Sequence, residues 1–342
     1  MKLSFNSNWG KKEDATTGIL LALAFASVPA WADKGLLFFC SVLLTHILFA
    51  LSFNLIFGLS GFVSFGHAAF FAIGAYTTGY LLQRQGEMYP FLFWIASGLS
   101  GAVAAIIVAA IALRRSSGVY FAILTLALAE LVHVLISKST FLGREDGMTG
   151  IKRPVMGSGI LQVDLAAGDN LYYAILIGAI FVGVVIYMLW HNAFGRTLGA
   201  IRQDEERVRF LGVNVLAMRI GVFVASGAFA GLAGGLYAPS AQLLTPDLGN
   251  WGYSALPILF CLVGGANYFW GPVLGAIIFA GLEYATRDVI GLSEIIVGMV
   301  LLIVVLAFPG GLIGGVITFR QRWPGRLSRN ASSASLVRES AE

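Results

Sequence analysis

The chain has 342 residues, of which 58% are hydrophobic and only 12% are charged. Soluble globular domains are about 45–50% apolar and about 25% charged, so this composition excludes a soluble enzyme, a nucleic-acid-binding protein and a disordered chain. The formal net charge of +4 is too small to indicate a nucleic-acid partner. A lipid bilayer is the solvent that this composition fits.

A helix that crosses a bilayer needs about 20 predominantly apolar residues. This criterion predicts an all-α polytopic membrane protein with about ten transmembrane helices, within a range of eight to ten. The stretches between them are too short for a second domain with its own core, so residues 15–317 are expected to form a single transmembrane domain. The predicted spans are Ala15–Ala32, Leu36–Phe57, Phe62–Leu82, Pro90–Leu113, Val119–Ser137, Leu171–Trp190, Met218–Ala238, Trp251–Phe269, Gly271–Ala285 and Ile290–Phe308.

The charges of the loops orient these helices. If the N-terminus is inside, fifteen of the 22 lysines and arginines lie on the cytoplasmic side, as the positive-inside rule requires. We therefore expect N- and C-termini that are both cytoplasmic. Residues 1–14 would form the cytoplasmic N-terminus, 138–170 an outer loop, 191–217 a cytoplasmic loop and 318–342 a basic, disordered cytoplasmic tail.

Two of the predicted spans have a second interpretation. The basic pair Lys11 and Lys12, the apolar run after it and Ala30-Trp31-Ala32 also fit a cleaved secretory signal. Either interpretation leaves the second span entering from outside, so the rest of the topology is unchanged. Gly271–Ala285 is short and interrupted by glycines, which favours a tilted, broken or partly buried helix.

Motifs of catalysis and phosphate binding are missing from the sequence. It contains no P-loop, no H-E-x-x-H, no C-x-x-C and no G-x-S-x-G, whose spacings build phosphate, metal, redox and nucleophile sites. The four histidines are scattered along the chain. We therefore predict no catalytic residue, no metal ligand set and no cofactor bound by this chain.

The segment Gly58–Phe71 combines small and polar residues inside an apolar region. Small residues let helix backbones approach closely in lipid. Gly61, Ser64, Gly66 and His67 are candidates for lining a translocation pathway. The alternative is close helix packing in which the hydroxyl groups are satisfied internally.

Glu130 and His133 are three residues apart in the fifth predicted span, and so share one face of the helix. Ionisable groups at membrane depth face a cavity, pair with each other or mark a translocation route. The pair is therefore either a link between two helices or part of a pathway.

The segment Gly195–Val215 differs from the spans because it is charged and lies in the predicted cytoplasmic loop. Apolar residues recur in it at roughly helical spacing, which indicates one amphipathic helix that ends at Gly212. Its acidic residues argue against binding to anionic lipid, so a protein groove is the better partner. The residues expected to form this coupling surface are Gly195, Arg196, Leu198, Ile201, Arg202, Glu205, Arg207, Val208, Leu211 and Gly212.

Several separated stretches, in order along the chain, resemble the permease subunits of branched-chain amino acid ABC importers, in particular the LivM type. The resemblance runs from about Leu36 to Gly315. Within it, Tyr120 and Thr125 join the pathway candidates. The stretches that carry it are Gly61–Tyr76, Gly118–Ala127, Asp146–Gly150, Gly195–Val215 and the glycines of Gly264–Gly275.

The resemblance implies an inner-membrane permease that pairs with a second, homologous permease. Two cytoplasmic ATP-binding subunits would hold the ATP and magnesium, and an extracytoplasmic solute-binding protein would deliver the amino acid, docking on the outer loop. Gly195–Val215 would correspond to the coupling motif E-A-A-x-x-x-G. Glu205 and Gly212 fit that motif, whereas Glu206 and Arg207 stand where small residues are usual.

Three other functions remain open from the sequence. Related permeases import urea or short-chain amides on a similar scaffold. A proton-coupled secondary transporter would use Glu130 and His133 as its proton relay and would work without ATP. A membrane-embedded enzyme is the third alternative, which the missing catalytic motifs disfavour.

Overall fold

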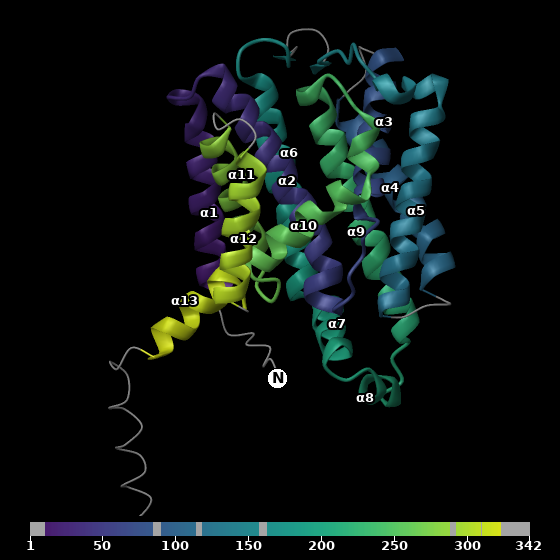
Figure 1. Cartoon of the computed structure of the whole chain (residues 1–342), viewed down its shortest axis with the longest axis vertical. Coiled ribbons are helices and arrows are strands. Elements are labelled where there is room, and N and C mark those ends of the chain that lie inside the picture. The colour runs from purple at the N-terminus through teal and green to yellow at the C-terminus, as the bar shows by residue number, and fades with distance from the viewer. Residues whose placement is uncertain are drawn as a thin grey trace, which may run out of the picture.

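The computed structural model describes residues 11–84, 90–113, 118–156, 163–287, 292–308 and 310–322, and it consists mainly of packed helices (Figure 1). Residues 1–10 of the predicted N-terminal segment and residues 323–342 of the predicted tail lie outside the described residues. The α-helices are α1 (Lys11–Ser27), α2 (Lys34–Asn54), α3 (His67–Arg84), α4 (Pro90–Ala112), α5 (Val119–Lys138), α6 (Asn170–His191), α7 (Ala193–Gln203), α8 (Glu205–Phe210), α9 (Val215–Ala241), α10 (Trp251–Gly264), α11 (Gly271–Thr286), α12 (Ser293–Ala307) and α13 (Gly311–Arg322).

Each predicted span corresponds to helical structure, but a count of ten crossings is not confirmed. Among the described residues, six helical segments are long and apolar enough to cross a membrane: Lys34–Ser60, Leu92–Ala112, Val119–Lys138, Asn170–His191, Val215–Ala241 and Ile295–Val316. Three apolar helices are shorter, namely Asp14–Ala30, Trp251–Gly264 and Gly271–Thr286. Helix α3 belongs to neither group. The chain is therefore a multi-helix membrane protein, with six candidate spans among the described residues.

The third predicted span begins later than expected. Helix α2 continues into a π-helical turn, Leu55–Ser60, and Gly61 ends that turn in the left-handed conformation with φ +74°. An irregular segment follows, and α3 begins only at His67. The prediction of a helix from Phe62 was therefore wrong, because apolar length alone does not detect a glycine that turns the backbone out of the helical region.

Helices α3, α4 and α9 pack with their backbones almost in contact. A Cβ atom on Gly74 of α3 would lie 2.0 Å from the carbonyl oxygen of Gly231 in α9. A Cβ on Gly101 of α4 would lie 2.5 Å from the carbonyl oxygen of Gly227. Only glycine permits this approach, which is how helices associate where lipid supplies no hydrophobic force.

Helices α10 and α11 form a short hairpin. Asn250 caps α10 by accepting a hydrogen bond from the backbone of Gly252 at 2.7 Å, and the helix contains Pro257. It ends at Gly264, five residues before the predicted end of the span, because Gly265 adopts φ +110°. A Cβ on Gly264 would lie 1.7 Å from the carbonyl oxygen of Gly271, so this tight turn requires glycine.

The polar segments gather at the two ends of the bundle (Figure 1). One end carries the 139–169 connection, with short 3-10 turns at Thr140–Leu142 and Arg144–Asp146 and a two-stranded ladder in which β1 (Val155–Met156) pairs antiparallel with β2 (Val163–Asp164). Another 3-10 turn, Pro246–Gly249, precedes α10 at the same end. The opposite end carries α7 and α8.

Candidate functional site

The irregular segment between the π turn and α3 places His67 in the core. The His67 side chain is fully buried and lies 5.4 Å, ring centre to ring centre, from both Phe49 and Phe53. Its Nε2 is 3.0 Å from the hydroxyl of Ser52, and that hydroxyl donates to the carbonyl of Phe49 at 2.7 Å. Because the Ser52 hydroxyl hydrogen is already used, Nε2 carries the ring N–H and donates a hydrogen bond to the Ser52 oxygen. Nδ1 is then an acceptor.

Ser64, Gly66 and Thr125 meet where the irregular segment crosses α5. The Thr125 hydroxyl accepts from the backbone amide of Phe65 at 3.2 Å, and the Ser64 hydroxyl accepts from that of Gly66 at 3.3 Å. A Cβ on Gly66 would lie 2.3 Å from the carbonyl oxygen of Thr125. The sequence therefore needs glycine here so that non-helical backbone can pass against α5.

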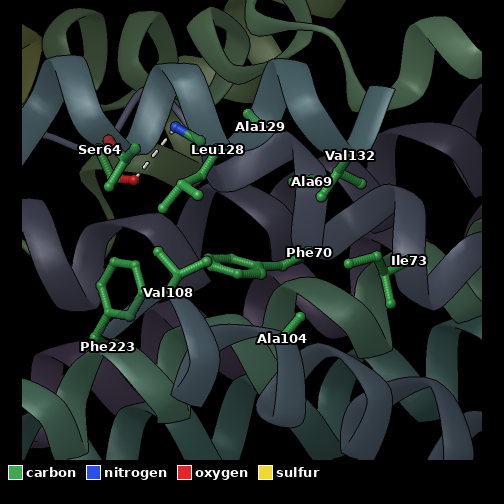
Figure 2. A pocket seen from close by; sticks show the side chains of 12 residues that line it. Ser64, Ala69, Phe70, Ile73, Ala104, Val108, Leu128, Ala129, Val132 and Phe223 are labelled. Carbon is green, nitrogen blue, oxygen red and sulfur yellow. Dashed lines mark hydrogen bonds between the residues drawn. The ribbon is translucent and has the colours of Figure 1, made fainter. Parts of the chain in front are cut away.

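A small cavity of about 20 Å³ adjoins this crossing. Figure 2 shows Ser64 at this cavity and the side chains of Phe70, Val108 and Phe223 among its apolar walls. Thr125 also lines the cavity. Such a volume holds about one water molecule. It is too small for an amino acid, so cargo would need either a different conformation or a surface shared with another subunit.

Three buried polar atoms around the break have no hydrogen-bond partner: Oδ1 of Asn54, Oγ of Ser60 and Nδ1 of His67. Nearly all buried polar groups in folded proteins are paired, so each exception needs an explanation. All three lie within fourteen residues of sequence, at the one place where α2 leaves regular helical geometry. Discontinuous helices with free polar groups are a common feature of transporter binding sites.

The remaining pathway candidates lie on α5 and are not brought together. Tyr120 is 77% exposed. His133 directs Nδ1 to the carbonyl oxygen of Pro246 at 3.2 Å, and Oε2 of Glu130 is buried without a hydrogen-bond partner. Among the described residues, no Glu130–His133 ion pair occurs within 4 Å. The direct link between these two side chains is therefore not formed.

The predicted coupling segment consists of two helices. Asn192 caps α7 through the amide of Gly195 at 3.0 Å, and Asp204 caps α8 through the amide of Arg207 at 3.0 Å. Asp204 has an extended backbone, which divides the expected single helix. Gly212 ends α8 with φ +83° and donates to the carbonyl of Arg209 at 3.0 Å.

The apolar stripe of this segment faces inward. Leu198, Ile201 and Val208 are 0%, 3% and 7% exposed within the chain itself, so they fix the two helices to the bundle. The interpretation of these three residues as an open docking stripe was wrong, because the bundle itself occupies their face. Leu211, in contrast, is 77% exposed and its neighbour Phe210 is 89% exposed.

Two basic residues connect α7 and α8 to the region of the break. Arg202 donates from Nη1 to the carbonyl of Gly58, in the π turn, and to Oδ1 of Asn267 at 3.0 Å. Burial lowers the pKa of the Arg202 guanidinium, which still stays charged because the ordinary pKa of arginine is so high. Through these bonds, α7 is attached to the turn that precedes the irregular segment.

Arg219 forms the second connection. It donates from Nη2 to Oε2 of Glu205 at 2.7 Å, and its guanidinium lies 4.4 Å from the ring centre of Phe62. Arg209 binds the other carboxylate oxygen of Glu205, also at 2.7 Å. Only the Glu205–Arg209 pair, four residues apart within α8, could be expected from the sequence. The other contacts join residues far apart in the chain, and no sequence pattern indicates them.

No group of three His, Cys, Asp or Glu side chains is placed to hold a metal ion in the part of the chain that the structure describes. Ser52, Asn54, Phe223 and Ser254 were not identified from the sequence. Ser254 accepts from the amide of Ala68 at 2.9 Å. Isolated serines and asparagines in apolar runs were the available signal, but they do not indicate which backbone they approach.

Comparison with known proteins places this architecture in a family. The chain is 27% identical over 318 residues to the high-affinity branched-chain amino acid transport system permease protein LivM of Salmonella typhimurium, covering 86% of this chain and 74% of that protein. A probable LivM of Methanocaldococcus jannaschii is 22% identical, covering 78% and 90%. The guanosine ABC transporter permease protein NupQ of Bacillus subtilis is 28% identical, covering 65% and 72%.

No solved structure matches the chain. The model of the family described as branched-chain amino acid transport system / permease component matches residues 35–308. This match includes the break after α2, both helices of the α7–α8 segment and the α10–α11 hairpin. The chain belongs to this family of permease components.

Proposed function

We propose that this chain forms half of the translocation pathway of an ATP-driven importer for branched-chain amino acids or related small molecules. A second, homologous permease would supply the other half. Two ATP-binding subunits would bind at the α7–α8 end, on the cytoplasmic side, and a solute-binding protein at the opposite end. The chain itself would carry no ATP chemistry.

The observation that carries the proposal is the physical connection between α7–α8 and the break after α2. Arg202 joins α7 to Gly58 in the π turn, while Glu205 and Arg219 join α8 to Phe62. A movement imposed on α7 and α8 would therefore act directly on the segment that holds Ser64 and His67. Coupling of this kind needs a contiguous set of packed or bonded groups with more than one arrangement.

The exposed tip of this segment supports a protein partner. Phe210 and Leu211 are large apolar side chains in a charged surrounding, and both are mostly exposed. Aromatic and aliphatic anchors with a charged rim are typical of protein interfaces. Glu206 and Arg207 supply charges beside the tip, where they would tune specificity.

Cargo other than amino acids is a real alternative within the family. The relative named as a guanosine transporter permease covers 65% of this chain, so the scaffold does not by itself specify an amino acid. Urea and short-chain amides are also compatible with a small polar pathway. Selectivity in such systems rests in part on the solute-binding protein that delivers the cargo.

The test is uptake by the complete complex in proteoliposomes. We expect uptake of radiolabelled leucine that requires ATP inside, the ATP-binding subunits and the binding protein, and that continues when the proton gradient is dissipated. Uptake by this chain alone, driven by a proton gradient, would establish the secondary-transporter mechanism instead. Competition by unlabelled valine, guanosine and urea distinguishes the cargo classes.

The orientation has its own test. A cysteine introduced at Thr197 in α7 should resist a membrane-impermeant thiol reagent in intact cells. The native Cys40 and Cys261 are buried and give little background. Labelling of Thr197→Cys from outside would place α7 and α8 on the external face and contradict the proposed ATPase site.

A further inference from the structure

A crevice separates the N-terminal helix from the rest of the bundle. It has a volume of about 370 Å³ and lies between α1, α2, α6 and the start of α11. Nearly all of its surface is apolar. Its walls include Ala22, Leu48, Ile180, Gly183 and Val273.

Helix α1 is fixed at both ends of this crevice. Near one end, the Asp14 carboxylate lies 3.7 Å from Nε2 of His191. Near the other, the hydroxyl of Tyr172 donates to the carbonyl of Phe25 at 2.6 Å. Between these contacts α1 does not close onto α6, since no atom lies within 4 Å of the position that a Cβ on Gly183 would take. The space is therefore part of the architecture.

The dimensions of the crevice fit one hydrocarbon chain. Eleven residues separate Asp14 from Phe25, which is about 16 Å of helix at about 1.5 Å per residue. Half of a hydrocarbon core of about 30 Å is about 15 Å. The outer face of α1 is apolar and exposed, with Leu20 and Leu23 each more than 60% exposed, so lipid chains contact this face of the helix.

Water and amino acids do not suit the crevice. Even an apolar cavity of about 150 Å³ stays dry, and an empty space of this size forfeits dispersion contacts along its walls. The ammonium and carboxylate of an amino acid would find few partners there. A hydrocarbon chain from the surrounding membrane fills the space without either cost.

One end of the crevice carries an unused hydrogen-bond donor. The indole Nε1 of Trp270 is buried without a partner, and Trp270 lines the crevice. Its ring lies 3.0 Å from the position of a Cβ on Gly18, hence near the Asp14 end. An occupant that satisfies this donor carries an oxygen acceptor at that end of its hydrocarbon chain.

We propose that this crevice is a binding site for a membrane glycerophospholipid. One acyl chain lies between α1 and α6, and an ester carbonyl accepts a hydrogen bond from Nε1 of Trp270. The lipid completes the packing of α1 on the bundle. This site is separate from the break after α2 and does not depend on the identity of the transported cargo.

The test uses the full-length chain, purified with the subunits that accompany it and reconstituted with phosphatidylethanolamine that carries a diazirine on one acyl chain. Illumination should label residues that line the crevice, such as Ala22, Leu48 and Val273. The labelling is read residue by residue, so that labelling of the exposed Leu20 and Leu23 by bulk lipid is counted separately. Gly183→Leu should lower this labelling by about tenfold, the effect of about 1.4 kcal/mol of lost binding, because the leucine occupies the crevice. Gly281→Leu is the matched control, since Gly281 is also a helical glycine with nothing within 4 Å of its Cβ position, and it does not line the crevice.

A second pair of variants acts from the opposite wall. Ala22→Leu fills the crevice from α1, whereas Ala24→Leu on the exposed side of the same helix does not. Trp270→Phe removes only the donor and should lower labelling less than Gly183→Leu. Size-exclusion chromatography confirms that each variant is folded. Labelling unchanged in both Gly183→Leu and Ala22→Leu would overturn the proposal, as would a cysteine at Gly183 that cross-links to another subunit in place of lipid.

Discussion

The two ends of the helix bundle are held by different kinds of bond. At the end of the 139–169 connection, the backbones of Met148 and Leu244 form an antiparallel bridge with hydrogen bonds of 2.8 and 3.0 Å. The hydroxyl of Tyr76 donates to the same Leu244 carbonyl at 2.8 Å. Gln83 donates to the carbonyl of Thr149 at 2.6 Å. Each of these hydrogen bonds has a backbone carbonyl as its acceptor, and its donor is either a backbone amide or a polar side chain.

At the other end, α7 and α8 depend on charged side chains and a few buried apolar ones. Arg202 and Arg219 reach from this end toward the break after α2. An ion pair between partly exposed side chains contributes about 1 kcal/mol or less, so it can break and form again at little cost. The comparison therefore contrasts an end held largely through backbone hydrogen bonds, called the fixed end below, with an end held mainly by side chains, where we predict that α7 and α8 can shift.

The largest expected effect comes from Val208→Asp, on the inner face of α8. Val208 is 7% exposed, and a carboxylate placed there loses hydration without a partner, at a cost of about 3 kcal/mol or more. We expect α7 and α8 to detach from the bundle. Limited proteolysis should cut residues 193–214 at least tenfold faster than in the wild type, an effect of about 1.4 kcal/mol or more.

Arg207→Ala, whose side chain is largely exposed, is the matched control on the same helix. It should leave proteolysis unchanged. Equal cleavage of Val208→Asp and the wild type would show that the inner face does not hold this segment, and would remove the distinction between its two faces.

The next effect concerns the exposed tip. Phe210→Ala and Leu211→Ala leave the chain folded because neither side chain packs inside it. If the tip anchors an ATP-binding subunit, each truncation should cost about 2 kcal/mol of binding, or roughly thirtyfold in affinity. Co-purification of the ATP-binding subunits measures this loss. Retention of those subunits by the double variant would place the ATPase contact elsewhere.

At the fixed end, Gly147 and Gly150 form a matched pair. Both have positive φ, +78° and +72°, so alanine at either position strains the backbone. At Gly147 the ψ of 176° adds to this strain, because essentially only glycine adopts that combination. A Cβ on Gly147 would also lie 2.4 Å from the carbonyl of Leu244, whereas nothing approaches a Cβ on Gly150. Gly147→Ala should therefore lower the melting temperature more than Gly150→Ala. Equal melting temperatures would mean that the backbone at Leu244 moves away from the added Cβ at little cost in free energy.

Much of the helical architecture could be predicted from apolar length alone. The positions of α4, α5, α6 and α11 agree with the predicted spans to within a few residues. Helix starts set by polar caps or glycine were missed, as at His67 and Asp204. A hydropathy pattern reports what a helix buries, but it does not report where the backbone leaves the helical region.

Some residues around the break after α2 could be singled out from the sequence, but their contacts could not. Ser64, Gly66 and His67 were identified as small or polar residues in an apolar segment, and Thr125 through the resemblance. The structure places all four around this break, and their role in a pathway stays a prediction. The stripe of α7 and α8 was misread, because a helix face that packs on its own bundle has the same periodicity as one that binds a partner. Only the three-dimensional structure shows whether such a face packs on its own bundle or is open to a partner.

The smallest expected effect comes from breaking the ion pair between Glu205 and Arg219. An ion pair at the fixed end of the bundle serves as its control. Glu205 and Arg219 lie 2.7 Å apart with side chains 32% and 21% exposed, so Arg219→Gln should cost about 1 kcal/mol. We expect ATP-binding subunits to co-purify normally, because the tip is unchanged. Binding-protein-stimulated ATP hydrolysis should fall by about fivefold, in line with that free energy, since the link from α8 to Phe62 is lost.

Lys138 and Glu145 form the control pair at the fixed end. They are 2.9 Å apart, but their side chains are 72% and 74% exposed, and solvent screens such pairs. The hydrogen bond and charge of Lys138 lower the pKa of Glu145, so any stabilisation is present above the ordinary glutamate pKa and is lost as the pH falls through the lowered value. Lys138→Gln should change neither the melting temperature at neutral pH nor ATP hydrolysis. If it lowered hydrolysis as much as Arg219→Gln, the two ends would transmit movement equally, and the contrast between a fixed and a shifting end would be lost.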